Sequence, residues 1–115
     1  MNNLKSELLP HLKDGKLTWC EGDVFTFRIR VTLSSLGEKI EDHTGYTYVA
    51  EFFDVSGKEI LAVTQDGDES ETFAIAFDAA TTSLFPRGRY FYDVHVLCPD
   101  GTRITAGNDL PISVV

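Results

Sequence analysis

The stretch that decides the fold runs from residue 84 to residue 97 and reads Leu84-Phe85-Pro86-Arg87-Gly88-Arg89-Tyr90-Phe91-Tyr92-Asp93-Val94-His95-Val96-Leu97. Proline and glycine at its start favour a turn, because proline fixes one backbone dihedral and glycine accepts conformations that other residues avoid. Tyrosine and valine then occupy every second position, and successive side chains of a strand point to opposite faces. The stretch therefore predicts a turn followed by a long strand with one buried face.

The tyrosine that follows the turn predicts how two sheets are joined. In β-sandwiches of the immunoglobulin type, a tyrosine near the start of the sixth strand returns its hydroxyl to the backbone a few residues upstream, an arrangement called a tyrosine corner. Tyr90 is the candidate for this role and Tyr92 the alternate, with Leu84, Pro86 and Gly88 shaping the corner. The competing interpretation is an aromatic strand that simply follows a turn.

Similar strand patterns occupy most of the remaining chain. The clearest begins at Val24 and keeps a period of two as far as Leu33. Seven or eight strands and no long helix indicate an all-β fold, an immunoglobulin-like antiparallel β-sandwich over residues 16–115. Residues 1–15 carry leucines at helical spacing interrupted by Pro10, and we expect them to form a short N-terminal arm. The other predicted strands are 16–20, 46–53, 59–64, 73–77, 102–106 and 110–115, with one helical turn at 79–84.

Composition limits the class of protein. The chain has 115 residues, of which 43% are hydrophobic and 24% charged, as is ordinary for a single globular domain with its own core. The formal net charge is -8 and no run of cations would neutralise phosphates, so nucleic acid is not an expected partner. No apolar stretch approaches the roughly 20 residues that span a bilayer, and the start lacks an export-signal pattern. We therefore expect a soluble chain without a membrane partner.

The histidines and cysteines show no pattern typical of catalysis or metal binding. His11, His43 and His95 fall in the arm, a loop and a strand, without a nucleophile signature or a metal-ligand spacing. We expect His95 to be solvated and paired with a nearby carboxylate. Cys20 and Cys98 lie far apart in the sequence, so buried free thiols are expected, with a disulfide between two strands as the alternative.

The acidic segment from Asp66 to Glu71 is the densest group of carboxylates. Calcium binding in an EF-hand loop needs glycine at the sixth place and glutamate at the twelfth, which here are Glu71 and Phe77. A solvated acidic hairpin is therefore expected. No catalytic, cofactor-binding or metal-binding residue is assigned, and no cofactor is expected.

Five short motifs carry a resemblance to a known family. They are Gly22-Asp23-Val24-Phe25-Thr26-Phe27, Asp42-His43-Thr44-Gly45-Tyr46-Thr47, Leu84 to Gly88, Arg89-Tyr90-Phe91-Tyr92-Asp93-Val94 and Asp100-Gly101-Thr102. In order and spacing they resemble small structural proteins and domains of tailed bacteriophages and prophages, whose immunoglobulin-like sandwich is related to N-terminal domains of baseplate and tail proteins. The resemblance implies a non-enzymatic virion part, made in the bacterial cytoplasm, that docks to copies of itself or to other assembly proteins. The chain departs from the family pattern in its arm, its Cys98 and its acidic loop.

The alternation of side chains also predicts an interaction surface. If Tyr90 and Tyr92 face the core, Phe91 and Leu97 face outward, and the strand at 46–53 places Val49 and Phe53 outward in the same way. The two strands are neighbours in one sheet of this fold, so Val49, Phe53, Phe91 and Leu97 are predicted to form one apolar patch. Such a patch marks an interface or is covered by a further segment. We expect it to be covered by a second subunit or by the leucines of the arm, Leu4, Leu8, Leu9 and Leu12.

Two classes of function follow, both without catalysis. The first is a structural module that works by protein–protein docking in virion assembly. The alternative is a sandwich that binds a carbohydrate or another small ligand, with Trp19, Phe53 and Phe91 stacking on sugar rings. An enzyme is not expected, because no nucleophile, base and orienting group are recognisable together.

Overall fold

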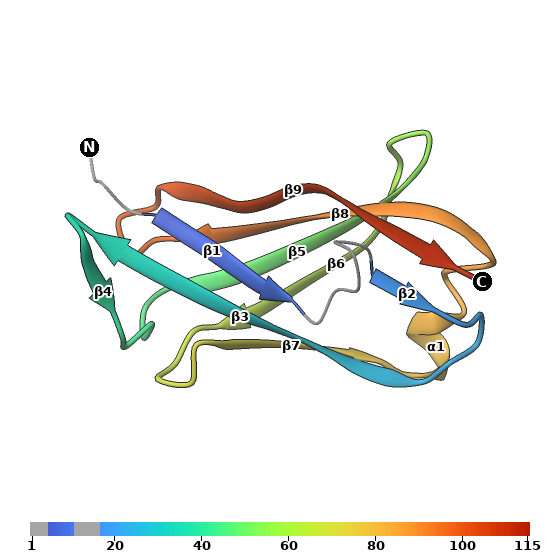
Figure 1. Ribbon diagram of the computed structural model, residues 1–115, viewed down its shortest axis with the longest axis horizontal. Helices are drawn as coiled ribbons and strands as arrows, with labels where there is room; N and C mark the ends of the chain where they lie inside the picture. Colours follow the sequence, from blue (N-terminus) through green and yellow to red (C-terminus); the bar gives the residue numbers. More distant parts are fainter. Residues whose placement is uncertain (1–4, 11–16) are drawn as a thin grey trace.

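The computed structural model describes residues 5–10 and 17–115 and has the predicted all-β fold. Within these residues, nine strands and one turn of helix follow each other along the chain (Figure 1). The elements are β1 (Lys5–Pro10), β2 (Leu17–Trp19), β3 (Phe25–Ser35), β4 (Glu38–Ile40), β5 (Thr47–Asp54), β6 (Glu59–Asp66), β7 (Thr72–Phe77), α1 (Ala79–Thr82), β8 (Gly88–Leu97) and β9 (Arg103–Val114).

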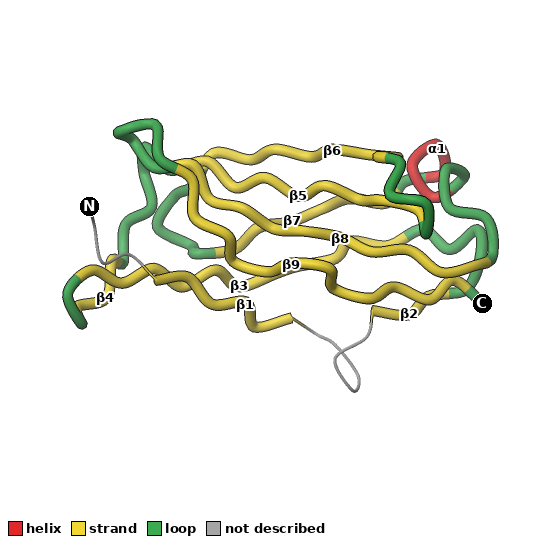
Figure 2. The backbone as a smooth tube through the Cα atoms, turned by 90° about the horizontal axis from the view of Figure 1, so that it is seen from above, coloured by secondary structure: helices red, strands yellow, loops and turns green. Residues whose placement is uncertain are grey.

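The strands form two sheets that pack face to face (Figures 1 and 2). In the four-stranded sheet, β3 pairs with β1, β4 and β7. The five-stranded sheet has the order β2-β9-β8-β5-β6. Among the described strands, β2 with β9 is the one parallel pair. This is the immunoglobulin-like sandwich predicted from the sequence, with α1 in the crossover from β7 to β8.

The N-terminal segment differs from its prediction as an arm. Residues 5–10, which include Leu8 and Leu9, form strand β1 and pair antiparallel with β3 from Ile29 to Ser34. The leucine spacing suggested a helix, but the edge of a long neighbouring strand offers hydrogen-bonding partners for an extended backbone. Leu4, His11 and Leu12 lie outside the described residues.

The C-terminal part of the chain also differs from its prediction. Two strands were expected, at 102–106 and 110–115, whereas β9 is continuous. Its register with β8 shifts between Tyr92 and Val94 and again between Val94 and His95. Such β-bulges admit extra residues without ending the strand. Here Asn108 and Asp109 stand opposite the single residue Asp93, and Ala106 is extra opposite the step from Val94 to His95.

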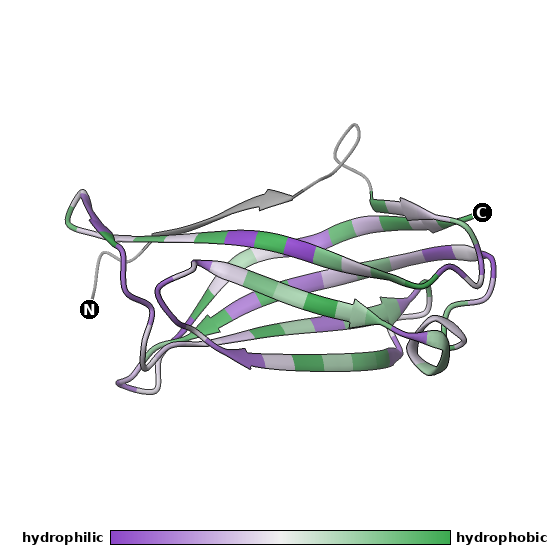
Figure 3. Ribbon diagram, turned by 90° about the horizontal axis from the view of Figure 1, so that it is seen from below, coloured by the Kyte–Doolittle hydropathy of each residue, from purple (hydrophilic) through white to green (hydrophobic). Residues whose placement is uncertain are grey.

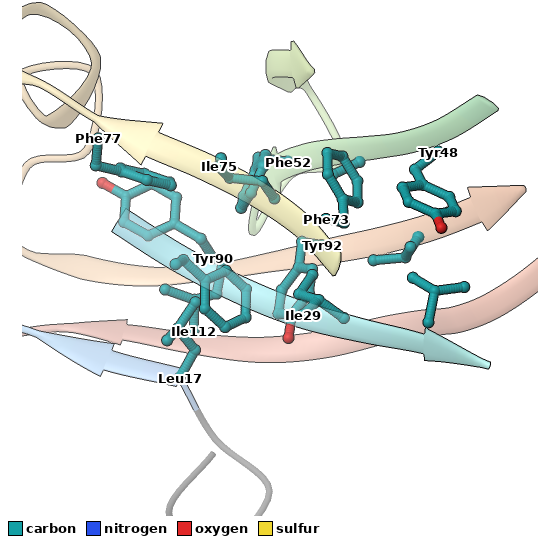
Figure 4. Close-up of a cluster of buried hydrophobic side chains, with 14 of the residues drawn as sticks. Leu17, Ile29, Tyr48, Phe52, Phe73, Ile75, Phe77, Tyr90, Tyr92 and Ile112 are labelled. Atoms are coloured by element: carbon teal, nitrogen blue, oxygen red, sulfur yellow. The ribbon is translucent and has the colours of Figure 1, made fainter. Parts of the chain in front are cut away.

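The core lies between the two sheets and is built from the predicted alternation (Figure 4). The Phe52 ring stacks on Tyr92 of its own sheet at a centroid distance of 5.6 Å and meets Phe77 of the opposite sheet at 5.7 Å. Full burial of each such ring stabilises the fold by roughly 1.5–3 kcal/mol, so rings that bridge the layers hold the two sheets together.

The tyrosine corner predicted at Tyr90 is confirmed. The Tyr90 hydroxyl donates a hydrogen bond to the carbonyl oxygen of Pro86, four residues upstream. Gly88 begins β8 with φ +154°, a backbone conformation that other residues rarely adopt. Leu84, which was also predicted to shape the corner, is 45% exposed and therefore lies outside the core. The alternate candidate, Tyr92, is buried and has no hydrogen-bond partner for its hydroxyl among the described residues.

A histidine from a predicted loop lies in the interior. His43 is fully buried, accepts a hydrogen bond at Nδ1 from the Tyr48 hydroxyl and donates from Nε2 to the carbonyl oxygen of Ile40 at 2.9 Å. Burial and the charges of nearby carboxylates raise the pKa of Tyr48 to about 12, so this hydroxyl keeps the proton that it donates.

The acidic segment is solvated only in part, which corrects its prediction. Asp66 ends strand β6, and the side chain of Glu71 is only 12% exposed. The Glu71 carboxylate lies 3.2 Å from Nζ of Lys39 and 3.7 Å from the Arg30 guanidinium. Glu71 also has φ +58°, a left-handed backbone conformation that residues other than glycine seldom adopt.

The cysteines are free thiols in this structure. Cys98 is buried as predicted, whereas Cys20 is exposed, and the alternative of a disulfide is not realised. Among the described residues, no helix has the length and apolar character that crossing a membrane requires.

Candidate functional site

The four residues predicted to form an apolar patch all lie on the outer face of the five-stranded sheet, between β5 and β8. Phe53 stands directly opposite Phe91, Val49 stands opposite His95, and Leu97 is at the far end of β8. Phe53, Phe91 and Val49 are half-buried and Leu97 is 38% exposed. The six-residue step from Phe91 to Leu97 spans roughly 20 Å, so the aromatic pair and Leu97 occupy opposite ends of the face.

The arm does not cover the aromatic pair with its described residues. Strand β1 hydrogen-bonds to β3 in the four-stranded sheet, whereas Phe53 and Phe91 face outward from the other sheet. The prediction that the arm covers the patch therefore fails for residues 5–10, and the prediction of a second subunit as the cover stays a prediction.

An open hollow of about 480 Å³ lies beside the aromatic pair. Aromatic and acidic side chains meet there, because the bulge in β9 carries Asp109 next to β8, where its backbone N–H donates to Oδ1 of Asp93 at 2.7 Å. This contact could not be predicted from local pattern, because the position of a bulge depends on pairing between distant residues. The hollow is lined by Phe53, Asp54, Val55, Gly57, Phe91, Asp93 and Asp109.

Five carboxylates border this end of the face, and the charge of Lys58 acts on one of them, Asp54, from beyond ion-pair distance. Within the described residues, none of them has a lysine or arginine side chain within ion-pair distance. Hydrogen bonds from Ser56 and from the Lys58 backbone lower the pKa of Asp54, so it is ionised at neutral pH. A hydrogen bond with Glu51 raises the pKa of Glu59, as happens when two carboxyl groups face each other. The group consists of Glu51, Asp54, Glu59, Asp93 and Asp109.

His95, expected in solvent, is held between strands in the middle of the same face. It is 6% exposed, with Nε2 3.1 Å from Oε1 of Glu51 and Nδ1 3.3 Å from Oγ1 of Thr105. The predicted carboxylate partner is present, but the predicted exposure is wrong. The burial of His95 does not follow from the pattern of its own strand, because its neighbours come from β5 and β9, far away in the chain.

Trp19, a predicted sugar-stacking residue, belongs to the core. It is 6% exposed and its ring lies 5.1 Å from both Phe25 and Phe77. Its indole N–H has no acceptor among the described residues. A ring enclosed in this way does not present the open face on which a sugar stacks, so the aromatic candidates are reduced to Phe53 and Phe91.

Comparisons with known proteins support the fold and leave the function open. No protein-family model and no curated protein matches the chain. Among solved structures, the chain is similar to one part of dimeric latent PorU from Porphyromonas gingivalis, with a TM-score of 0.59 and 10% identity. The match covers 100% of this chain and 10% of that chain, so the chain spans about a tenth of the length of PorU. At this identity the similarity shows a shared β-sandwich fold.

Proposed function

We propose that this chain is a non-enzymatic interaction module that docks another protein through the Phe53–Phe91 end of its five-stranded sheet. The observation that carries the proposal is the pair of half-buried aromatic rings, directly opposite in register and bordering an open hollow of about 480 Å³. Interfaces commonly centre on aromatic side chains within a polar rim, because these rings bury much apolar area with few rotatable bonds.

A virion or tail-associated part of a phage or prophage is the specific form of this proposal. Its support is the order of the sequence motifs, together with their places in the fold. Residues 22–27 lead into β3, residues 42–47 lead into β5, and residues 100–102 join β8 to β9. In this role the chain is made in the bacterial cytoplasm, and its partners are other virion or assembly proteins.

Co-expression with the products of neighbouring genes tests the proposal. We expect the chain to co-elute with a tail, head or baseplate protein, and the double variant Phe53→Ser/Phe91→Ser to lose at least about tenfold in affinity, as aromatic hot spots do. Leu97→Ser, at the other end of the same face, is the matched control and retains binding. Unchanged co-elution of the double variant refutes the docking surface, and neighbouring genes unrelated to phage refute the virion role.

A carbohydrate is the second candidate ligand, favoured by one observation. The hollow combines two aromatic rings with carboxylates, and these are the groups that stack on and hydrogen-bond to sugars. A glycan array probed with the purified protein tests this candidate. Strong binding that Phe91→Ser removes supports it, and an array without signal refutes it.

A further inference from the structure

The two outer faces of the sandwich each contain a region of charge, and the two regions are of opposite sign. The five-stranded sheet presents Glu51, Glu59 and Asp93 around its aromatic pair. On the four-stranded sheet, Arg28 and Arg30 project outward from β3, and this alternation appears as green and purple bands along the strand in Figure 3. Arg89 and Arg103 also lie at exposed, outward positions of β8 and β9, so the acidic character belongs to the region around the hollow and not to the whole face.

The opposite charges are only partly satisfied within one molecule. Arg30 is 3.7 Å from Glu71, whose carboxylate also holds Lys39. Arg28 is exposed and has no ion-pair partner among the described residues. On the five-stranded sheet, Asp93 likewise has no lysine or arginine partner among the described residues. Arg28 and the carboxylates beside the hollow therefore form no ion pair with a lysine, arginine or carboxylate of the described residues.

The surroundings of Arg28 suit a close approach to a flat partner. Arg28 lies directly opposite Ala74 in register, and Thr26 lies opposite Ala76, so small exposed side chains flank the arginine on β3 and β7. A guanidinium can rest on an aromatic ring and form ion pairs with carboxylates at the same time. The hollow between Phe91 and Asp93 offers both kinds of group.

We propose that a second copy of this chain docks on the acidic region, with its Arg28 inserted into the Phe53–Phe91 hollow against Asp93 and its β3–β7 surface lying on the aromatic rings. The proposal rests on the proposed docking function and names the partner. The contact joins two different surfaces, so each copy keeps one free face and further copies add head to tail.

The net charge of -8 does not prevent this contact at physiological salt. The screening length is then about 8 Å, whereas the shortest dimension of the molecule is 26 Å. Charges on distant surfaces are therefore screened, and the matched charges at the contact dominate.

Sedimentation velocity over a wide concentration range tests the proposal. In about 0.15 M salt, we expect concentration-dependent association that weakens in about 1 M salt, where the screening length is about 3 Å. Arg28→Glu and the double variant Asp93→Asn/Glu59→Lys should each lower the association constant by at least about tenfold. Asparagine at position 93 keeps an acceptor for the Asp109 N–H, which protects the bulge. Arg87→Glu makes the same charge change outside both faces and should associate like the wild type.

Mixing the two variants separates the head-to-tail contact from any other kind of association. The Arg28→Glu chain keeps the acidic region and the double variant keeps Arg28, so an equimolar mixture should form one-to-one dimers and nothing larger. A wild type that stays monomeric, or an Arg28→Glu chain that associates like the wild type, overturns the proposal. A third outcome separates the two proposals. If the wild type is monomeric and binds a neighbouring gene product that the Phe53→Ser/Phe91→Ser variant does not bind, self-stacking is refuted and the docking function stands.

Discussion

Tyr90 donates its hydroxyl hydrogen to the carbonyl oxygen of Pro86, and this bond ties the start of β8 to the connection that crosses between the sheets. Two residues further along the same face, Tyr92 is fully buried whereas Tyr90 is 8% exposed, and the Tyr92 hydroxyl has no partner among the described residues. The two side chains have the same chemistry and belong to the same strand, but only the Tyr90 hydroxyl makes a hydrogen bond. They form a matched pair for measuring what the corner contributes.

Replacing Tyr90 by phenylalanine removes the corner bond and little else. We expect the free energy of unfolding to fall by about 1 kcal/mol, the usual net contribution of one hydrogen bond, because the Pro86 carbonyl also loses its donor. Urea unfolding of the wild type and of Tyr90→Phe measures the difference. Equal midpoints would show that the corner bond does not contribute to stability.

Replacing Tyr92 by phenylalanine should have the opposite sign. Burial raises the pKa of Tyr92 to about 12, so the hydroxyl is neutral and its cost is that of an unpaired buried polar group. Removing such a group recovers part of a desolvation penalty of about 1–3 kcal/mol, and we expect Tyr92→Phe to be as stable as the wild type or more stable. The same urea titration reports it. A loss as large as that of Tyr90→Phe contradicts this expectation.

The parts of the fold that could be predicted are those encoded by local pattern. The alternation in β3 and the turn before Tyr90 involve residues that are close in the sequence, so one sequence was enough to place them. Strand β1 was not predictable in this way, because its extended form depends on pairing with Ile29 to Ser34 of β3. The burial of His43 depends in the same way on Tyr48 across a turn.

The candidate site likewise contains residues that local pattern could place and residues that it could not. Phe53 and Phe91 were placed outward by counting along their own strands, and their register then put them opposite each other. Asp109 reaches the hollow through a bulge, and His95 is covered by residues of two other strands. Such features arise from tertiary pairing, which no local pattern records.

Gly67 is the glycine at which added volume should be most costly. A Cβ at this position would lie 2.5 Å from the His43 carbonyl oxygen and 3.1 Å from that of Tyr46, both of which are backbone atoms that cannot move aside. We expect Gly67→Ala to lose about 3 kcal/mol, the upper part of the usual range for overpacking. Gly57→Ala is the control, because its Cβ meets nothing within 4 Å and its cost of about 1 kcal/mol comes from φ +89° alone. Equal losses in the two variants would refute the steric explanation.

Aspartates that hold turns give the protein a specific acid sensitivity. Four of them accept hydrogen bonds from a serine or threonine two residues later, and a fifth caps α1 through the Thr81 N–H. The hydrogen bonds lower the pKa of each carboxyl below its ordinary value. The four turn residues are Asp42, Asp54, Asp68 and Asp100.

The sign of the pH effect follows from these lowered values. These carboxylates contribute their full stability above the unfolded-state pKa of about 3.9, where they are ionised in both states. As the pH falls below that value, the unfolded chain binds more protons than the folded chain, and this favours unfolding. The contribution is lost as the pH falls through the lower folded-state values. We expect urea midpoints to decline from about pH 4 downward, and Asp100→Asn to flatten the decline because asparagine keeps an acceptor for Thr102 but does not titrate. Adding Asp54→Asn should flatten it further, since the two turns lie apart, and an unchanged slope in the double variant would contradict the role of the turn carboxylates.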